Sequence, residues 1–253
     1  MRKLLNIPYG LDLRQKIDFY LPDTTARAAA IWFHGGGITG GDKENYAFLA
    51  ENLTSSGIAL ILPGYRLIPN VAFPDFVNDA AAAAACALDS LKEQGINGPV
   101  LLGGSSAGAY LSMMLCFDRH YLARHGKTPE DISAYFFNSA QPTAHYNILK
   151  QRGEDFRAIV VDETAPLYFV RDDKPQRHML ILCADNDMYS RRTQNILMRE
   201  TLMRFGHSKE DVQFETLNGY GHCGYDSKLD SDGRYILENR IIMLLNKAME
   251  VYK

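Results

Sequence analysis

The sequence lacks a hydrophobic segment long enough to cross a membrane. The longest mostly apolar runs, such as residues 76–88, contain Asn78, Asp79 or many alanines, whereas a spanning helix needs about 20 predominantly apolar residues. The N-terminus MRKLLNIPYG begins with basic side chains, but its apolar run breaks at Asn6 and lacks the apolar core of a signal peptide. We therefore expect a cytoplasmic protein without a membrane partner; removal of an export signal during processing is the alternative.

An excess of positive charge is also lacking. The chain has 27 lysines and arginines against 30 aspartates and glutamates, a net charge of −3 and a pI near 6.2. These values give no general electrostatic reason to bind nucleic acid or an anionic membrane. We therefore expect no nucleic-acid partner.

Cysteine is scarce and scattered. The chain contains no CxxC pair, and its four cysteines are Cys86, Cys116, Cys183 and Cys223. Three of them lie in apolar surroundings, where a reduced thiol behaves as a small hydrophobic side chain. We expect free thiols in a reducing compartment.

Internal repeats and Ser/Gly-rich linkers are absent as well, so we assign residues 1–253 to a single domain. An apolar content of 46% is enough for a sizeable core in a chain of this length. Short apolar runs without polar alternation predict central strands of a parallel sheet that is covered on both faces. These runs are 28–33, 58–62, 100–102, 134–137 and 179–182.

The remaining segments complete an α/β pattern. Residues 212–217 predict a half-exposed strand, and residues 15–22 predict an antiparallel edge strand. Helical patterns fall between and after the strands, at residues 73–95 (with six consecutive alanines), 191–206 and 233–252. Strands that alternate with helices predict a mostly parallel, doubly wound sheet with helices on both faces. Residues 143–174 show no clean period, and we expect a small cap-like insertion there, before the strand at 179–182.

A glycine-flanked serine follows the apolar run 100–102. Gly104-Ser105-Ser106-Ala107-Gly108 fits G-x-S-x-G between a predicted strand and a helical pattern, which is the context of a nucleophile elbow. The small residues permit a tight turn that places Ser106 at a helix N-terminus, where partial positive charge favours a developing oxyanion. The motif alone is moderately specific, so other residues have to support it.

A second glycine-rich segment, WFHGGGITGGD (32–42), follows the run 28–33. Its three consecutive glycines let the backbone approach a ligand and point N–H groups into a cavity. Such a loop can form one half of an oxyanion hole, and the N–H after the nucleophile forms the other. A phosphate-binding loop is the alternative, but no Lys-Ser/Thr follows in Walker spacing.

Ser106 needs a base to remove its proton. His222 lies in the glycine-rich loop NGYGHCG after the last predicted strand, and it is our candidate. His34 belongs to the glycine loop, which we expect it to brace. His178 precedes a strand, and surface positions on helices or loops are expected for His120, His125, His145 and His207.

The acid that orients this histidine is expected after the strand at 179–182, where Asp185 and Asp187 compete. Asp185 directly follows the strand and is expected to cap the turn. Asp187 reaches the loop where side chains converge on the histidine, so we predict Asp187. The resulting chain order, Ser106, Asp187 and His222, is that of α/β-hydrolases.

The ordered set of motifs resembles the α/β-hydrolase esterases of the hormone-sensitive-lipase-like group and their carbohydrate-esterase relatives. The motifs are HGGG (34–37), PGYRLIP (63–69) with FPDFVNDA (73–80), GSSAG (104–108), ADND (184–187) and GYGH (219–222). The resemblance covers about residues 28–225. It implies a catalytic triad of Ser106, Asp187 and His222. It implies an oxyanion hole formed by the backbone N–H groups of Gly36, Gly37 and Ala107, and a structural pair formed by Arg66 and Asp79.

The chain also departs from this group. Its elbow reads Gly-Ser-Ser where many members have Gly-Asp-Ser, and it has no long segment before the first strand. Residues 165–182 instead resemble the corresponding segment of relatives that act on small esters and plant-wall carbohydrates. These departures argue against a bulky lipid site and lipase activity.

The expected reaction is hydrolysis of short-chain acyl esters, including acetylated or feruloylated carbohydrate, through an acyl-enzyme and without a metal or organic cofactor. The partner is therefore a small-molecule ester, and Tyr146 and Phe156 are candidates to line its pocket. An amide hydrolase of arylformamidase or small-peptidase type would use the same triad. A catalytically inactive hydrolase fold that acts as a binding module is the third alternative.

Overall fold

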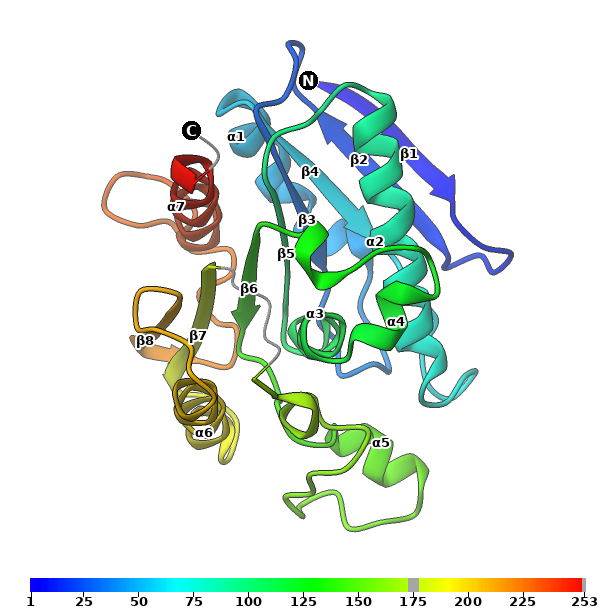
Figure 1. Cartoon of the computed structure of the whole chain (residues 1–253), viewed down its shortest axis with the longest axis vertical. Helices are drawn as coiled ribbons and strands as arrows, with labels where there is room; N and C mark the ends of the chain where they lie inside the picture. The colour runs from blue at the N-terminus through cyan, green and yellow to red at the C-terminus, as the bar shows by residue number, and fades with distance from the viewer. Residues whose placement is uncertain (173–177, 252–253) are drawn as a thin grey trace.

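The computed structural model describes residues 1–172 and 178–251 and contains an eight-stranded sheet in the order β1-β2-β4-β3-β5-β6-β7-β8 (Figure 1). The strands are β1 (Arg2–Pro8), β2 (Lys16–Leu21), β3 (Ala28–Phe33), β4 (Ile58–Pro63), β5 (Val100–Ser105), β6 (Ala134–Asn138), β7 (His178–Asn186) and β8 (Val212–Gly221). β2 pairs antiparallel with both β1 and β4, whereas all other neighbours are parallel. The mostly parallel sheet predicted from the apolar runs is confirmed.

Helices connect these strands and cover both faces of the sheet. They are α1 (Ala50–Ser55), α2 (Asp75–Glu93), α3 (Ala107–Phe117), α4 (Arg119–Ala123), α5 (Tyr146–Gln151), α6 (Arg191–Arg204) and α7 (Ile236–Val251), with 3₁₀ helices η1 (Lys43–Leu49), η2 (Pro129–Asp131) and η3 (Pro166–Phe169). α2, α3 and α6 pack on one face, and α1 and α7 pack on the other (Figure 1). The three predicted helices are confirmed as α2, α6 and α7; residue 252, the last of the third prediction, lies outside the described residues.

The central strand β3 shows why its sequence carries no polar alternation. Ala29, Ile31 and Phe33 join the core beneath α2 and α3, while Ala28, Ala30 and Trp32 join the core beneath α1 and α7. Successive side chains of a strand point to opposite faces, so a strand between two helical layers must be apolar at every position. Most alanines of α2 follow a related rule, since all of them except Ala82 are buried and their small side chains let the helix lie close to the sheet.

The prediction for residues 15–22 is half right. β2 is antiparallel, but it is not an edge strand, because β1 pairs with it on its outer side. Every residue of β1 is exposed and a register irregularity lies between Leu4 and Ile7. The strand therefore has no buried face to impose an alternating pattern on its sequence, and no sequence pattern predicted it.

The expected pair of Arg66 and Asp79 is confirmed. Arg66 donates from Nε to Asp79 Oδ2 at 2.8 Å and from Nη2 to Oδ1 at 2.7 Å. The Asp79 side chain is buried and also accepts a hydrogen bond from Gln15 Nε2 at 2.8 Å. This bidentate pair ties the loop after β4 to the first turns of α2.

The segment expected as an insertion leaves the sheet after β6 and contains α5 and η3 (Figure 1). Residues 173–174 of the predicted range 143–174 lie outside the described residues, as do residues 173–177 of the segment 165–182. The single domain with a cap-like insertion stays a prediction. All four cysteines are free, as expected. In residues 1–172 and 178–251, no helix has the length and apolar character needed to cross a bilayer.

Candidate active site

Ser106 occupies a strained corner between β5 and α3. Its φ of 54° lies in the left-handed region, which costs free energy in a residue other than glycine. Its N–H donates to Asn138 O of the neighbouring strand β6 at 2.8 Å, which holds the corner in place. Gly108 is required by close approach, because a Cβ there would lie 2.1 Å from Phe33 O. The spacing of G-x-S-x-G thus reflects a turn packed against β3.

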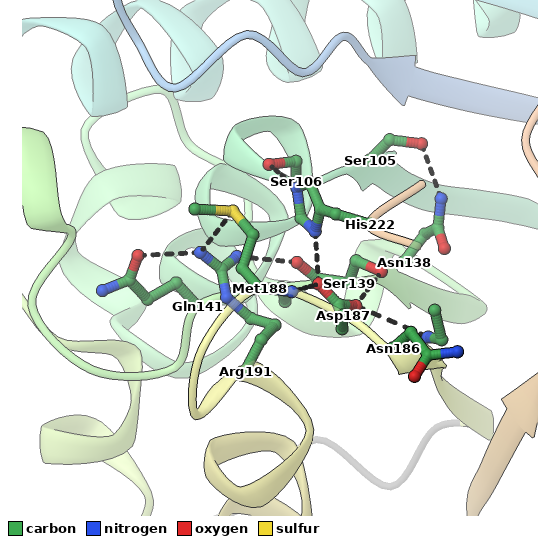
Figure 2. Close-up of polar contacts among 12 residues, drawn as sticks. Ser105, Ser106, Asn138, Ser139, Gln141, Asn186, Asp187, Met188, Arg191 and His222 are labelled. Atoms are coloured by element: carbon green, nitrogen blue, oxygen red, sulfur yellow. Dashed lines mark hydrogen bonds and ion pairs between the residues drawn. The ribbon is translucent and has the colours of Figure 1, made fainter. Parts of the chain in front are cut away.

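Ser106, His222 and Asp187 form a chain of hydrogen bonds (Figure 2). His222 Nε2 lies 2.8 Å from Ser106 Oγ, and His222 Nδ1 lies 2.5 Å from Asp187 Oδ1. The carboxylate can only accept, so Nδ1 carries the proton and Nε2 is left to accept from the serine hydroxyl. Three segments that are far apart in the sequence thus meet at the carboxyl edge of the sheet.

The Asp187 carboxylate is held by several donors. Its side chain is only 1% exposed, and besides His222 it accepts from Ser139 Oγ and from Met188 N, each at 2.7 Å. Burial raises the pKa of Asp187, but the hydrogen bond and charge of His222, with the bonds from Ser139 and Met188, lower it below its ordinary value overall. The carboxylate is therefore ionised at neutral pH.

Asp185 lies elsewhere. Its Oδ1 accepts from Gly219 N at 2.9 Å and from Tyr220 N at 3.3 Å, so it joins the ends of β7 and β8. This agrees with the expected turn-capping role, and the structure places Asp187, not Asp185, against His222.

The glycine loop faces Ser106 from the end of β3. Gly36 has φ +112°, and a Cβ there would lie 2.2 Å from Gly40 O, so no other residue fits this turn. Asn147 Nδ2 of α5 donates to Gly37 O at 2.6 Å and fixes the loop. In the described part of the chain, the N–H groups of Gly36, Gly37 and Ala107 donate to no other protein group.

His34 braces this loop, as expected. It is fully buried, its ring stacks on Tyr65 at 4.3 Å between centroids, and its Nδ1 lies 2.6 Å from Gly35 O. Tyr65 OH in turn donates to His34 O at 2.7 Å. Burial lowers the pKa of His34 from 6.5 to about 4, against the opposing effect of the bond to Gly35. His34 is therefore neutral in the folded protein at neutral pH.

This burial predicts a loss of stability in acid. Between about pH 6.5 and 4 the unfolded chain binds a proton at His34 and the folded chain does not. The contribution of His34 to stability is thus complete above pH 6.5 and is lost as the pH falls toward 4, by about 2 kcal/mol at pH 5. Urea unfolding at pH 7 and pH 5 tests this with His34→Asn, whose amide can still donate to Gly35 O. The variant should lose about 2 kcal/mol less than the wild type on acidification; equal losses would contradict the prediction.

A buried polar network, which was not predicted from the sequence, lies behind Asp187. Tyr225 OH lies 3.2 Å from Ser139 Oγ and donates to Asn138 Oδ1 at 2.6 Å. Asn138 Nδ2 donates to Asp226 Oδ1, and Tyr46 OH donates to Asp226 Oδ2, both at 2.8 Å. Burial raises the pKa of the Asp226 carboxyl. A usable signal did exist, since Asn138 and Ser139 directly follow an apolar run and so had to lie at the carboxyl edge of the sheet.

Two histidine predictions were wrong. His145 and His207 were expected on the surface, but they are 0% and 5% exposed. His145 caps α5 by accepting from Asn147 N at 3.2 Å and packs between Tyr110 and Tyr146. Burial lowers the pKa of His145 well below its ordinary value, so its imidazole is neutral in the folded protein. The polar turns of the surrounding segment gave no sign of this burial.

Two cavities adjoin at this site. The first has a volume of about 440 Å³. It is lined by Gly35, Gly36, Gly37, Gly41, Asn45, Tyr46, Phe48, Ser106, Tyr146, Met188, His222, Cys223, Asp226 and Ser227. The second, here called the α5–α6 cavity, has a volume of about 740 Å³. It is lined by Gln141, Tyr146, Lys150, Phe156, Arg157, Ala158, Ile159, Met188, Tyr189, Ser190, Arg191 and Gln194.

Tyr146 lines both cavities, and Phe156 lines the second. Both aromatic residues that were expected to line a pocket therefore do so. Among the residues that the structure describes, no three His, Cys, Asp or Glu side chains are grouped so as to hold a metal ion.

Known proteins share segments of this sequence. Kynurenine formamidase of Salmo salar is 32% identical over 114 residues, which are 44% of this chain and 38% of that protein. Carboxylic ester hydrolase LipN of Mycobacterium tuberculosis is 34% identical over 104 residues, or 39% of this chain and 28% of that protein. The matched segments thus span well under half of these curated relatives.

The fold has known counterparts over nearly its whole length. A solved structure described as a truncated form of carbohydrate esterase from gut microbiota superposes with a TM-score of 0.75, at 18% identity and over 97% of both chains. A family model described as the alpha/beta hydrolase fold matches residues 30–225, which include the glycine loop, the elbow, Asp187 and His222. The chain therefore belongs to the α/β hydrolase fold family.

Proposed function

We propose that the protein is a serine hydrolase that cleaves carboxylic esters. The observation that carries the proposal is the chain of hydrogen bonds from Ser106 Oγ to His222 Nε2 at 2.8 Å and from His222 Nδ1 to Asp187 Oδ1 at 2.5 Å. A nucleophile, a base and an orienting acid in this arrangement suit acyl transfer. The partial match to a carboxylic ester hydrolase supports the same chemistry.

In the proposed mechanism, His222 Nε2 takes the hydroxyl proton while Ser106 Oγ attacks the ester carbonyl. The tetrahedral intermediate collapses to an acyl-enzyme, and His222 returns the proton to the leaving alcohol. His222 then deprotonates a water molecule that attacks the acyl carbonyl. The bond between the acyl carbon and Ser106 Oγ breaks, the acid leaves, and His222 returns the proton to Ser106 Oγ. Asp187 remains ionised throughout, in keeping with its low pKa, and keeps the proton of the resting imidazole on Nδ1.

The oxyanion of the intermediate would be stabilised by the backbone N–H groups of Gly36, Gly37 and Ala107. Three observations support these donors: they belong to the loop and the turn that line the cleft, they have no other acceptor among the described residues, and Ala107 begins α3. N–H groups at a helix N-terminus carry partial positive charge, and their rigid placement requires little reorganisation during the reaction.

The proposed substrates are esters of short acyl groups, including acetylated or feruloylated carbohydrate. The cleft of about 440 Å³ around Ser106 offers the polar side chains of Asn45 and Ser227 to hydroxyl groups. A panel of acetyl, butyryl, feruloyl and acetylated-sugar esters tests this proposal by comparing kcat/KM. Failure to turn over any ester, together with no labelling of Ser106 by a fluorophosphonate probe, would refute the proposed function.

Amide hydrolysis is a second candidate, favoured by the partial match to a kynurenine formamidase. The same residues would act, with an amine leaving in place of an alcohol. Kinetics on an N-formyl aromatic amine beside an acetyl ester of the corresponding phenol separate the two candidates. An arylformamidase should show the higher kcat/KM on the formamide.

The contact of Ser139 with Asp187 leads to a further prediction. Ser139→Ala should lower kcat about tenfold with little change in KM, because a lost hydrogen bond to a charged group is worth roughly 1.5–3 kcal/mol. Ser208→Ala is a matched control, since Ser208 Oγ also donates to an aspartate at 2.7 Å, but this aspartate is Asp211 and not the partner of His222. Equal effects of the two variants on kcat would show that Ser139 has no positioning role.

A further inference from the structure

The α5–α6 cavity is larger than the cleft around Ser106 that it adjoins, and the proposed mechanism leaves it without a role. It shares Tyr146 and Met188 with the cleft around Ser106. The N–H of Met188 donates to Asp187 Oδ1, and a Cβ on Gly37 would meet Tyr146 OH at 2.7 Å. A group bound in the α5–α6 cavity would therefore extend directly from a group bound at the triad.

The walls of this cavity are aromatic and apolar. The large hydrophobic side chains exposed there are Phe156, Ile159, Met188 and Tyr189, at 47%, 53%, 40% and 98% exposure. Exposed apolar side chains that gather around a hollow indicate a binding site, whereas scattered ones need no explanation. The cavity therefore suits an apolar or aromatic part of a ligand.

The charge of the cavity is of one sign. Its lining holds Lys150, Arg157 and Arg191 and, among the described residues, no aspartate or glutamate. Lys150 Nζ lies 4.5 Å from the Phe156 ring centroid and 5.6 Å from that of Tyr146, so an ammonium group sits beside the aromatic wall. Arg157 pairs with Asp155, but both side chains are largely exposed, and solvent weakens such a pair.

Arg191 adds a buried positive charge. It is 2% exposed, and within residues 1–172 and 178–251 no carboxylate lies within ion-pair distance of it. Its guanidinium instead donates to Ser139 O at 2.8 Å and Gln141 Oε1 at 3.1 Å (Figure 2). Burial lowers the pKa of Arg191, and the charge of Asp187 acts in the opposite direction. Arg191 also stands at the N-terminus of α6, where the helix dipole adds positive potential.

We propose that the α5–α6 cavity is a substrate subsite for an aromatic group that bears a carboxylate. The aromatic body would lie against Phe156 and Tyr146, and the carboxylate would face Lys150, Arg157 and Arg191. A compact, strongly hydrated anion would leave the apolar wall unused, so the site favours an amphipathic acid. That the cavity binds such an acid follows from its lining alone, and only the statement that this acid is part of a substrate rests on the proposed function.

Direct binding tests the subsite without any hydrolysis. Isothermal titration of the whole protein with 3-phenylpropanoate and with 3-phenylpropanamide compares a carboxylate with its neutral analogue. The acid should bind about tenfold more tightly, and raising the salt concentration should reduce the difference. Lys150→Met should reduce the ratio of the two Kd values several-fold. Lys92→Met, which removes an exposed lysine from the last turn of α2, should leave the ratio unchanged. Equal binding of acid and amide would overturn the proposal.

Turnover then shows which side of the ester occupies the subsite. One pair of substrates, 3-acetoxybenzoate and 3-acetoxybenzamide, carries the charge on the alcohol side. A second pair, the p-nitrophenyl monoester of isophthalic acid and its amide analogue, carries it on the acyl side. A higher kcat/KM for the carboxylate in either pair supports the proposal and names the side. If 3-phenylpropanoate binds but kcat/KM shows no preference for the carboxylate in either pair, the cavity is not a substrate subsite and the assignment is overturned. If 3-phenylpropanoate binds but no ester is hydrolysed, the proposed function is refuted while the binding site for the acid stands.

Discussion

Ser106→Ala is expected to lower kcat for p-nitrophenyl acetate by at least about 10⁴-fold, because it removes the atom that forms the acyl-enzyme. Ser106 Oγ is the hydroxyl that His222 Nε2 contacts at 2.8 Å. Without it, the glycine loop and the cleft can still bind an ester and polarise its carbonyl, so a small residual rate is expected. Covalent labelling by a fluorophosphonate probe should disappear in the same variant.

The neighbouring Ser105 offers a control that also removes one hydroxyl from the elbow. Ser105 is buried in β5, and its Oγ accepts from Asn138 Nδ2 at 2.7 Å rather than contacting His222. Ser105→Ala should cost about 1 kcal/mol of stability and keep most of the activity. Wild-type turnover in Ser106→Ala, with thermal unfolding showing a folded protein, would remove Ser106 from the mechanism.

Asp187→Asn should lower kcat about 10³- to 10⁴-fold and leave KM nearly unchanged. The neutral amide does not stabilise the imidazolium that forms when His222 takes the proton, and its NH₂ group can hold the ring in the wrong tautomer. The loss is expected at all pH values above the pKa of Asp187, which is lowered by the His222, Ser139 and Met188 contacts. Steady-state kinetics across neutral pH measure the effect.

Asp185→Asn is the matched control for this substitution. Asp185 lies near the end of β7 and Asp187 directly follows this strand, and both accept hydrogen bonds from backbone N–H groups. Asp185 is exposed, and an asparagine Oδ1 can still accept from Gly219 N, so kcat should change by no more than about fivefold. A larger loss in Asp185→Asn than in Asp187→Asn would reverse the proposed roles.

Much of the sheet could be predicted because the requirement for burial is local. A strand between two helical layers must be apolar on both faces, and the runs of β3, β4, β5, β6 and β7 satisfy this at nearly every position. β1 could not be found in this way, since its exposed side chains are under no such constraint. His145 was misplaced for the converse reason: its burial depends on Tyr110, which lies 35 positions away in the chain.

The sequence by itself determined where the reactive corner had to be and which residues could face it. Gly36 is required by backbone geometry within its own loop, since a Cβ there would meet Gly40 O, and the strand-to-helix turn needs small residues around Ser106, so both motifs are visible in the chain. Only the tertiary structure decided which aspartate meets His222, that Ser139 supports this aspartate, and that Arg191 is buried beside Lys150 around one cavity. These contacts join side chains across separate strands and helices, and their distances depend on how the layers pack, which no local pattern records.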